Sequence, residues 1–423
     1  RGCCRRLGTG SGFVCARRSF RYVRAVLVKD RMARVIAATL AALALWLAYC
    51  LSGVAWRLLR IARHRPETAA DAVRFGLLGA AKVAPHGLLY PAAMVESATV
   101  VAIGARDPSR AHRLASSWGI PRSGDYEAVL ADPAVEAVYI PLLNGLHYEW
   151  AAAALRAGKH VLCEKPLTSN AAEARALSRL AKARGLVLFE AFHYRYHPLA
   201  ERVRALVGSG SELGAVLALE VGAGLPSPDS LKAALGLGAR GVSPKMDVEL
   251  GGGNFMGQGC YAVSMARLLL GEPTGVLNAS MVEHPPGSRS DVSTTATLGF
   301  AGGATARLTA SALSVGFNLR ARCERGTLAV TNYLFPFVYH SLTVTPARGG
   351  GPARTEQCYG GGETTFELQL RAFVAAVRHG APFTTTADDA AANMQVVDAI
   401  YDAAGLGARG GSHGGSRAAK GPG

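Results

Sequence analysis

The stretch with the clearest chemical potential is VLCEKPLTSN at residues 161–170, where an apolar run ends in Glu164, Lys165 and Pro166. A lysine can accept or return a proton in catalysis when burial or neighbouring cations bring the pKa of its ammonium toward neutrality. The alternative is an ordinary surface ion pair between Glu164 and Lys165. The position predicts an acid–base site where an apolar strand passes into a loop.

A second pattern, VRFGLLGAAKVAP at residues 73–85, is typical of a turn that holds a dinucleotide. A short apolar strand runs into small residues at three spaced positions, although the second of these is normally glycine. Small residues let the backbone turn tightly and approach a pyrophosphate that is bound by the amides of a helix N-terminus. The turn therefore predicts cofactor contacts from Gly79, Ala81, Lys82 and Val83.

The identity of that cofactor is indicated by a second apolar run, ATVVAIGARD, which ends about 25 residues after the turn, where this fold contacts the adenosine ribose. An acid at Asp107 would bind a free 2′-hydroxyl, whereas Arg106 offers a planar cation to a 2′-phosphate. We predict NADP in preference to NAD. The alternatives are that Arg106 is a solvated loop charge and that Asp107 is the N-cap of a helix beginning near Pro108.

The elements that must position these residues alternate between apolar strands and amphipathic helices. Strands are expected at residues 73–78, 98–107, 137–143, 160–165 and 186–192, with helices between them at 108–117, 147–158 and 170–185. Such alternation predicts an α/β Rossmann domain over residues 72–192, with a parallel sheet covered by helices on both faces. Ligands bind beyond the carboxyl ends of the strands in this architecture, which is the edge where Glu164 and Lys165 fall.

The pattern changes after Pro198 into one amphipathic helix followed by strand-like runs at residues 216–225, 276–282, 293–300, 304–311, 319–331 and 340–346. This predicts an α+β domain over residues 193–406, with a large, mostly antiparallel sheet that has helices on one face and leaves the other open. The aromatic residues Phe192, Tyr194 and Tyr196 are expected to pack between the domains. Helices at 366–380 and 393–404 are expected to brace both.

Charge argues against nucleic acid as a partner, although the net charge is +16. Residues 1–65 hold 14 Lys or Arg against Asp30 alone, and the Gly-rich tail after residue 406 adds three more. The remainder carries 29 bases and 29 acids, so the folded body offers no net charge to a polyanion. The eight cysteines include no CxxC pair and no Cys/His spacing suited to zinc, so we expect neither a metal site nor a disulfide framework.

The two ends of the chain are interpreted separately. Residues 1–31 lack periodicity and are interpreted as a basic disordered or non-native leader. Residues 33–58 contain about 22 uncharged residues, enough to cross roughly 30 Å of hydrocarbon as a helix, so we predict a membrane anchor. If translation starts at Met32, the arginines after the anchor place the body in the cytosol; if residues 1–31 are present, their basic residues balance the count and leave the orientation undecided. A cleaved signal peptide or an organelle-targeting segment on a soluble protein is the alternative. Residues 407–423 are expected to be disordered.

Six motifs in order resemble the glucose-fructose oxidoreductase, inositol dehydrogenase and rhizopine-catabolism (Gfo/Idh/MocA) family. They are GLLGAAKVAP, ARDPSRA, the turn from Asn144 to His147, CEKPLTSN, EAFHYRYHP and ANMQVVDAIYDAAGLGAR. The resemblance covers roughly residues 73–409. Within the family, the sequence is similar to the branch of dimeric dihydrodiol dehydrogenases and NADP-dependent D-xylose 1-dehydrogenases. It implies a homodimer formed through the open sheet face, and a sugar or diol as substrate.

The resemblance also implies roles for individual residues. Lys165 would bridge the substrate hydroxyl and the cofactor ribose and exchange the hydroxyl proton, while Glu164 would orient the lysine or the ribose. A cis bond at Pro166 would fix the loop. The remaining cofactor contacts implied are Pro141, Asn144, His147 and Arg195. An N-cap of the following helix is the alternative role for Asn144.

One position departs from the family pattern. GGGNFMGQGCY places Gly257 where the family commonly has Asp, and Tyr261 where it has His or Tyr. Tyr261 is retained as a possible proton donor or substrate partner, with an ordinary core tyrosine as the alternative. Gln258 would face about 100° away on a helix and is a poor replacement for the lost carboxylate.

These patterns together predict an NADP-dependent oxidoreductase that moves a hydride between nicotinamide and a CH–OH group of a sugar or diol, with Lys165 as its central residue. The missing carboxylate at Gly257 motivates the alternative, an NADP-binding sensor or scaffold with little or no turnover.

Overall fold

The computed structural model describes residues 66–226, 244–360 and 362–410. The predicted leader at 1–31 and the predicted membrane anchor at 33–58 lie outside the described residues, as do residues 411–423 of the tail. Within the described ranges, no helix has the length and apolar character needed to cross a membrane.

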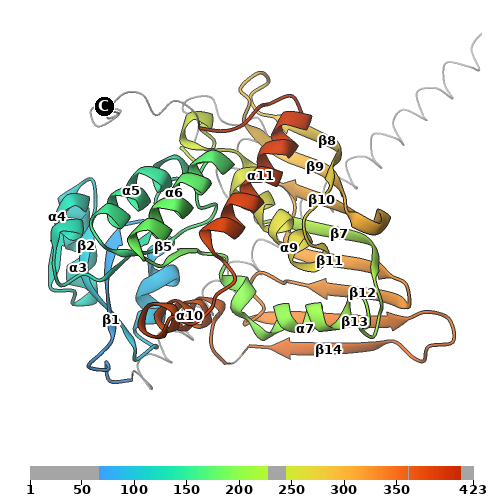
Figure 1. Ribbon diagram of the computed structural model, residues 1–423, viewed down its shortest axis with the longest axis horizontal. Coiled ribbons are helices and arrows are strands. Elements are labelled where there is room, and N and C mark those ends of the chain that lie inside the picture. Colours follow the sequence, from blue (N-terminus) through green and yellow to red (C-terminus); the bar gives the residue numbers. More distant parts are fainter. Residues whose placement is uncertain (1–65, 227–243, 361, 411–423) are drawn as a thin grey trace, which may run out of the picture. The chain divides into compact units, whose positions relative to one another are not determined.

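The first sheet has six parallel strands in the order β3-β2-β1-β4-β5-β6 (Figure 1). Its strands are β1 (Val73–Leu78), β2 (Ala98–Gly104), β3 (Arg122–Gly124), β4 (Ala137–Ile140), β5 (His160–Cys163) and β6 (Leu188–Glu190). The chain order reverses between β1 and β4, and ligands bind at such a point in open α/β sheets. The predicted Rossmann architecture is confirmed.

Both faces of this sheet are covered, because successive residues of each strand point to opposite sides and nearly all are apolar. Phe75 and Leu77 pack with one group of helices, while Leu78 and Ile140 pack with the other. The helices are η1 (Pro85–Leu89), α2 (Tyr90–Ala92), α3 (Pro108–Trp118), α4 (Tyr126–Ala131), α5 (Asn144–Arg156) and α6 (Ala171–Arg184).

The second sheet has eight strands in the order β14-β13-β12-β11-β7-β10-β9-β8 and is antiparallel except between β7 and β10. The strands are β7 (Val216–Gly224), β8 (Gly275–Glu283), β9 (Asp291–Gly299), β10 (Thr305–Ser311), β11 (Gly316–Cys323), β12 (Gly326–Thr331), β13 (Tyr339–Pro346) and β14 (Arg354–Tyr359). Helices α7 (Pro198–Leu206) and α9 (Cys260–Leu270) pack on one face. This confirms the predicted mostly antiparallel second domain.

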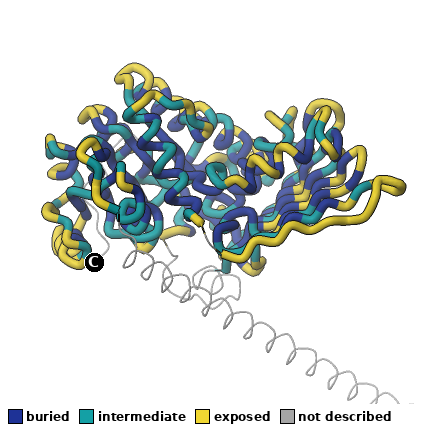
Figure 2. Tube along the Cα trace, turned by 90° about the horizontal axis from the view of Figure 1, so that it is seen from below, coloured by how far each residue is buried: buried dark blue, intermediate teal, exposed yellow. Residues whose placement is uncertain are grey.

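Burial alternates along the strands of this sheet, so only one face is in the core. Every second residue of β11 is buried from Phe317 to Cys323, whereas all of β14, an edge strand, is exposed (Figure 2). The single run predicted at 319–331 is in fact two strands, because Glu324 and Arg325 form a tight turn between β11 and β12.

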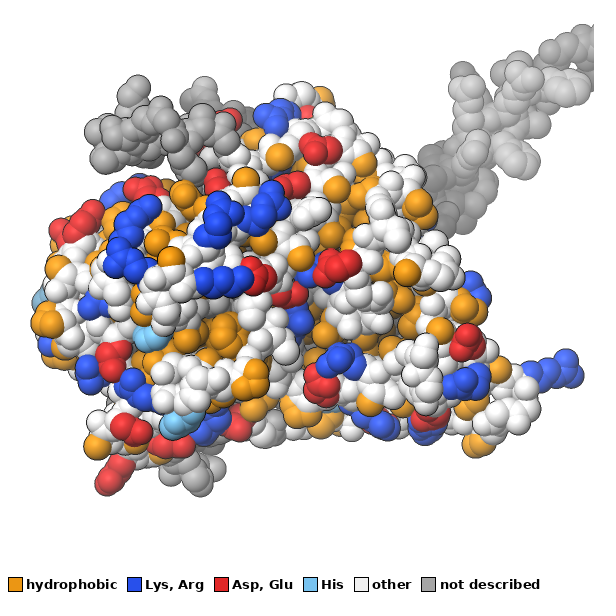
Figure 3. Space-filling view, viewed as in Figure 1, with side chains coloured by type: hydrophobic (Ala, Val, Ile, Leu, Met, Phe, Trp, Pro, Cys, Tyr) orange, Lys and Arg blue, Asp and Glu red, His pale blue; other side chains and the backbone are white. Residues whose placement is uncertain are grey.

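The last two helices connect the domains, as predicted. Helix α10 (Thr365–His379) packs against the first sheet through Leu370 and Phe373. Helix α11 (Ala387–Ala403) contacts both α6 and α9. Acidic and basic side chains are intermixed over the face seen in Figure 3, in keeping with a body whose charges balance.

The C-terminal boundary differs from the one expected. Residues 407–410, which we assigned to the disordered tail, belong to the packed body. Arg409 has no exposed surface, its guanidinium lies 4.0 Å from the centre of the Tyr401 ring, and it bonds to the carbonyl oxygen of Arg289. The glycine-rich composition concealed this because the contacts come from residues far away in the sequence.

Candidate active site

The predicted dinucleotide turn follows β1 directly and leads into η1. Gly79 has a φ of 125°, a backbone conformation that strongly favours glycine, and a Cβ there would lie 2.8 Å from the end of the Leu142 side chain. No backbone hydrogen bond among the described residues is donated by the amides of residues 80–83. Lys82 is exposed, and Ala81 and Val83 are half-buried. These amides form a cradle that fits a pyrophosphate.

The ribose end of the turn combines three polar residues. Asp107 caps α3 by accepting a hydrogen bond from the Ser109 amide at 2.9 Å. The structure thus shows the helix-cap role that was the alternative for Asp107. The contacts with Ser109 lower the pKa of Asp107. Arg106 is exposed at the tip of the strand. Arg110, which our sequence reasoning missed, reaches back from α3 to the Ala80 carbonyl oxygen at 3.1 Å.

Lys165 follows the carboxyl end of β5, and its peptide bond to Pro166 is cis, as expected. The Lys165 Nζ donates a hydrogen bond to the Gly257 carbonyl oxygen at 2.5 Å and lies 4.3 Å from the centre of the Tyr261 ring. Tyr261 is only 6% exposed. The lysine is half-buried between the two domains, and its closest contacts come from η4 (Phe255–Gly259) and α9.

Glu164 does not form an ion pair with Lys165 within the described ranges. Its Oε1 accepts a hydrogen bond from the Tyr139 hydroxyl at 2.7 Å, and its Oε2 accepts one from the Lys165 amide at 3.3 Å. Burial raises the pKa of Glu164, and the charge of Lys165 and the Tyr139 bond oppose that rise. The surface ion pair considered from the sequence is therefore not found.

Two glycines permit these approaches. A Cβ at Gly87 in η1 would overlap the Tyr139 hydroxyl, which must pass there to reach Glu164. A Cβ at Gly145 would lie 2.7 Å from the backbone of Leu250, at the end of η3 (Val248–Leu250). Neither glycine stood out in the sequence, because its neighbour in space is distant along the chain.

Asn144 and His147 lie on α5, which begins at the carboxyl end of β4. Asn144 is not the N-cap, because Leu143 occupies that position; its amide instead donates to the Gly251 carbonyl oxygen at 2.9 Å. His147 is fully buried, with Nδ1 2.8 Å from the Pro166 oxygen and Nε2 3.1 Å from the Leu142 oxygen. Burial lowers the pKa of His147 to about 4. Its ring is therefore neutral and donates to one of these two carbonyl oxygens, between the Lys165–Pro166 loop and the segment after β4. Pro141 is buried beside Gly79.

Glu190 supports the same loop and was missed from the sequence. Its Oε1 accepts the Leu167 amide at 2.8 Å, while its Oε2 is buried without a partner among the described residues. Burial raises the pKa of Glu190 to about 8, with Asp389 also raising it. The one signal that could have identified Glu190 is its position at the end of β6, which pairs with β5 in the sheet.

Arg195 lies in the connection η2 (His193–Tyr196), where its Nη1 donates to Asp389 of α11 at 2.6 Å. Asp389 also pairs with Arg267 at 3.1 Å. Phe192 and Tyr194 are buried in the core cluster of the second domain, whereas half-buried Tyr196 packs against the cluster of the first. Arg195 thus connects the domains through α11, and its predicted contact with the cofactor stays a prediction.

The helix that presents Gly257 and Tyr261 is anchored at its start. Asp291 Oδ2 accepts the Phe255 amide at 2.7 Å, and Asp291 Oδ1 accepts the Tyr401 hydroxyl at 2.6 Å. The Tyr401 oxygen in turn accepts the Met256 amide at 3.2 Å. These buried bonds satisfy amides that a helix start leaves unpaired.

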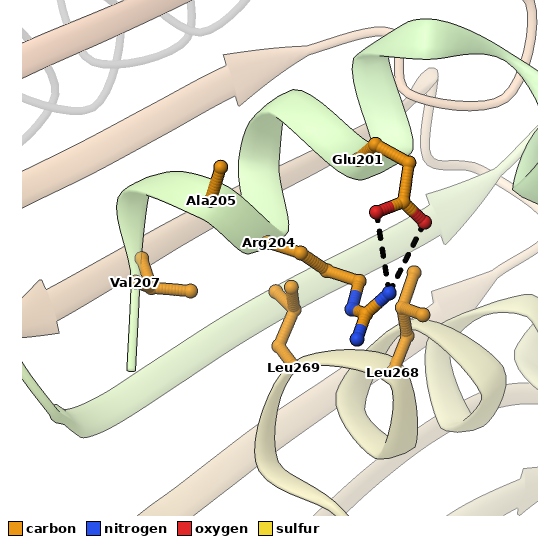
Figure 4. Close-up of a pocket in the computed structure, with 6 residues that line it drawn as sticks. All are labelled: Glu201, Arg204, Ala205, Val207, Leu268 and Leu269. Atoms are coloured by element: carbon orange, nitrogen blue, oxygen red, sulfur yellow. Dashed lines mark hydrogen bonds and ion pairs between the residues drawn. The ribbon is translucent and has the colours of Figure 1, made fainter. Parts of the chain in front are cut away.

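A hollow of about 370 Å³ lies elsewhere, between α7 and the end of α9 (Figure 4). It is lined by Glu201, Arg204, Ala205, Val207, Leu268 and Leu269. It contains none of the residues predicted to do chemistry, and we do not assign the site to it. No group of His, Cys, Asp and Glu side chains in the described parts of the chain could hold a metal ion.

Comparison with known proteins agrees with this architecture. Residues 73–192 match an oxidoreductase family with an NAD-binding Rossmann fold, and residues 200–329 match the GFO/IDH/MocA C-terminal domain. A D-xylose 1-dehydrogenase (NADP(+)) from Haloferax volcanii is 36% identical over 346 residues, which cover 79% of this chain and 98% of that protein. A trans-1,2-dihydrobenzene-1,2-diol dehydrogenase from Xenopus tropicalis is 33% identical over 190 residues, covering 44% of this chain and 54% of that protein.

Among solved structures, a 3-ketoreductase from Actinomadura kijaniata in complex with NADP and TDP-benzene superposes with a TM-score of 0.67 at 27% identity. That match covers 80% of this chain and 99% of the other. The chain therefore belongs to the Gfo/Idh/MocA oxidoreductase family. Its first domain is the family's NAD(P)-binding Rossmann fold.

Proposed function

We propose that the protein is an NADP-dependent oxidoreductase that transfers a hydride between nicotinamide and a CH–OH group of a sugar or diol. The observation that carries this proposal is the convergence of Lys165, Glu164 and Tyr261 at the carboxyl end of β5. The relatives that are named for xylose and for a dihydrodiol support the substrate class.

The preference for NADP rests on the basic residues near the adenosine end of the turn. Arg106 and Arg110 are both exposed cations beside the cradle, and Lys82 is exposed within it. Asp107 is engaged as a helix cap and is less available to a ribose hydroxyl. Guanidinium groups bind phosphate oxygens well, so this set fits a 2′-phosphate.

The bound cofactor would supply the hydride chemistry, and the chain's own residues would manage the proton. Lys165 Nζ would accept the hydroxyl proton during oxidation and return it during reduction. The Gly257 carbonyl and the Tyr261 ring hold the ammonium in place. Tyr261 would contact the substrate oxygen, and Glu164 would orient the loop that carries Lys165.

The test uses the purified full chain and two readouts. NADPH and NADH are titrated by fluorescence, and a panel of pentoses, hexoses and dihydrodiols is then tested for turnover. Lys165→Ala should lower turnover by about a hundredfold or more while NADPH binding stays within a few fold. Lys182→Ala on α6, with a side chain 68% exposed, is the matched control. Absence of NADPH binding would overturn the proposal.

A second candidate is a cofactor-binding sensor or scaffold. It is favoured by Gly257, which leaves no carboxylate at that position beside Lys165. Tight NADPH binding without turnover of any substrate would select it. Multiple turnovers that depend on Lys165 would exclude it.

We also propose that the open sheet face forms a homodimer. On this face, Glu220 of β7 lies between Arg307 of β10 and Arg320 of β11 in register, among threonines of neighbouring strands. Light scattering should give twice the chain mass, and Thr309→Arg should give the mass of one chain. A single-chain mass for the unmodified protein would reject the dimer.

Attachment to a membrane through residues 33–58 remains a proposal from the sequence. The full chain should sediment with membranes after cell breakage, and a chain without residues 33–58 should not. Equal distribution of the two proteins would reject an anchor in this segment.

A further inference from the structure

Lys165 is a half-buried cation whose closest contacts are neutral. Its ammonium contacts a carbonyl oxygen at 2.5 Å and an aromatic ring whose centre is 4.3 Å away. It makes no ion pair with a carboxylate in the parts of the chain that the structure describes. A charge taken partly out of water is stabilised by an opposite charge, so an anion brought to this position would be favoured.

The neighbouring carboxyl group makes no ion pair with the ammonium, although the charge of Lys165 lowers the pKa of Glu164. Glu164 directs one oxygen to the Tyr139 hydroxyl at 2.7 Å and the other to the Lys165 backbone amide at 3.3 Å. Both oxygens therefore have partners other than the ammonium. Tyr139, with no exposed surface, holds the carboxyl group in this orientation.

Space for a further group lies at Gly257. A Cβ built there would meet no atom of the described residues within 4 Å. The carbonyl oxygen of a residue and its Cβ are about 3 Å apart, so this space begins within roughly 6 Å of the Lys165 ammonium. An anionic group placed there would be close enough to pair with Lys165.

The side chains adjacent to Gly257 do not place a negative charge in that space. Gln258 is held at both ends of its amide by the backbone of Leu225, at 2.5 and 2.9 Å. Asn254 precedes Gly257 by one helical turn and is 4% exposed, and its Nδ2 has no partner among the described residues. Asn254 therefore offers a second hydrogen-bond donor on this side of the segment, but no negative charge.

We propose that the substrate carries its own carboxylate, which occupies the space at Gly257 and pairs with Lys165. This inference rests on the proposed function, because it concerns the same lysine and the same reaction. The reacting oxygen and the carboxylate must then both reach one ammonium. The carboxylate therefore lies one or two carbons from the reacting carbon, as in aldonic acids and their 2-keto or 3-keto counterparts.

The carboxylate takes no part in bond changes. In the direction of reduction, the ketone carbon gains the hydride, its oxygen gains the proton of Lys165 Nζ, and NADPH is oxidised to NADP. The product is the hydroxy acid, and solvent returns the proton to the lysine. Pairing with the carboxylate would bring the neighbouring carbonyl to the proton donor, which is the catalytic use of the extra charge.

The test compares substrates that differ in this one group. 2-Keto-D-gluconate and D-fructose share a C2 ketone and differ at C1, which is a carboxylate in one and a hydroxymethyl group in the other. Matched pairs with three to six carbons extend the panel. We expect kcat/KM to favour the acid by about tenfold or more, because hydrogen bonds to charged groups are the stronger ones. Binding of each compound to the NADPH-loaded protein is measured by calorimetry in parallel.

Gly257→Asp and Gly257→Asn separate charge from size, and a Cβ at this position meets no atom of the described residues within 4 Å. The aspartate should reduce the preference for the acid by about tenfold relative to the asparagine, in binding as well as in turnover. Equal or better use of the neutral member of every pair, equal ratios in the two variants, or no binding of any acid would each overturn the inference. NADPH binding is titrated in a separate experiment. A protein that does not bind NADPH would contradict the proposed function, and not only the inference about the carboxylate.

Discussion

At the scale of single residues, the least expected feature is the set of contacts that orients Glu164. Its carboxyl group is held by Tyr139, whose hydroxyl can pass only because residue 87 is glycine. The bond from Tyr139 lowers the pKa of Glu164 and thus opposes the effect of burial. The charge of Lys165 also lowers this pKa, so burial is opposed by both neighbours in setting the pH at which the carboxyl group ionises.

Tyr139→Phe should therefore shift the acidic limb of the kcat/KM profile to higher pH. Removal of the hydroxyl takes away a bond that favours the ionised carboxylate, so the pKa of Glu164 rises further. A pH series from 5 to 9 with NADPH measures this shift. Tyr359→Phe, at a side chain that is 72% exposed, is the control, and identical profiles for all three proteins would show that Glu164 does not titrate in the reaction.

Glu190 provides a second prediction at this scale, concerning stability. Its pKa is about 8 in the fold, compared with a usual value of 4.5. Between these pH values the unfolded chain releases a proton that the folded chain keeps, so this group lowers the free energy of unfolding as pH rises. Above about pH 8 both states are ionised and the effect becomes constant.

Glu190→Gln keeps an acceptor for the Leu167 amide and removes this titration. The free energy of unfolding of the variant, relative to that of the unmodified protein, should therefore rise by up to about 1.4 kcal/mol per pH unit between pH 5 and 8. Denaturation by urea at pH 5, 6.5 and 8 measures the difference. Glu201→Gln on α7, at an exposed position, is the control, and a difference that does not change with pH would contradict the assignment.

At the scale of elements, the site depends on how closely α5 approaches the loop before η4. Gly145 lies against the backbone of Leu250, and Asn144 bonds to the carbonyl oxygen of Gly251. These contacts hold the start of α5, in the Rossmann domain, against the segment that leads to Gly257. They fix the position of Lys165 relative to Tyr261.

Gly145→Ala should disturb this approach, because the added Cβ would lie 2.7 Å from the Leu250 Cα. Overpacking of this kind costs about 1–3 kcal/mol of stability, and here it should also lower turnover. Thermal unfolding and kcat/KM measure the two effects. Gly275→Ala, where a Cβ meets no atom within 4 Å in the part of the chain that the structure describes, is the matched control. Equal behaviour of the two variants would show that the contact is not needed.

At the scale of the whole described body, residues 407–410 connect the two domains. The Asn170 side chain at the start of α6 donates to the carbonyl oxygens of Arg409 and Gly410, at 3.1 and 3.0 Å. The Arg409 guanidinium lies 4.0 Å from Asp291, which anchors the helix of Tyr261. A segment that composition assigned to the tail thus contacts both halves of the site.

Removal of residues 411–423 should leave the unfolding transition unchanged, whereas removal of residues 407–423 should cost about 3 kcal/mol. The larger deletion leaves Asp291 buried without its cation. Chemical denaturation of both truncated chains measures this, and Arg409→Ala in the full chain isolates the guanidinium. Equal stability of the two truncated chains would show that the Arg409 contacts contribute nothing measurable.

The sequence by itself determined the architecture and placed Gly79, Glu164 and Lys165 at one edge of the parallel sheet. Uninterrupted apolar runs separated by amphipathic helices require a parallel sheet, and the carboxyl ends of its strands meet at one edge. This placed the turn at Gly79 and the pair Glu164–Lys165 correctly, because both depend on residues that are close in the sequence.

Only the tertiary structure decided which groups surround Lys165. Gly257 is 92 residues away from it, and the Arg409 segment that contacts Asn170 is 239 residues away from that residue. Glu190 and Tyr139 reach the same loop from neighbouring strands. Periodicity reports which face of an element is buried but not which side chain of another element meets it there, since that depends on packing between distant segments.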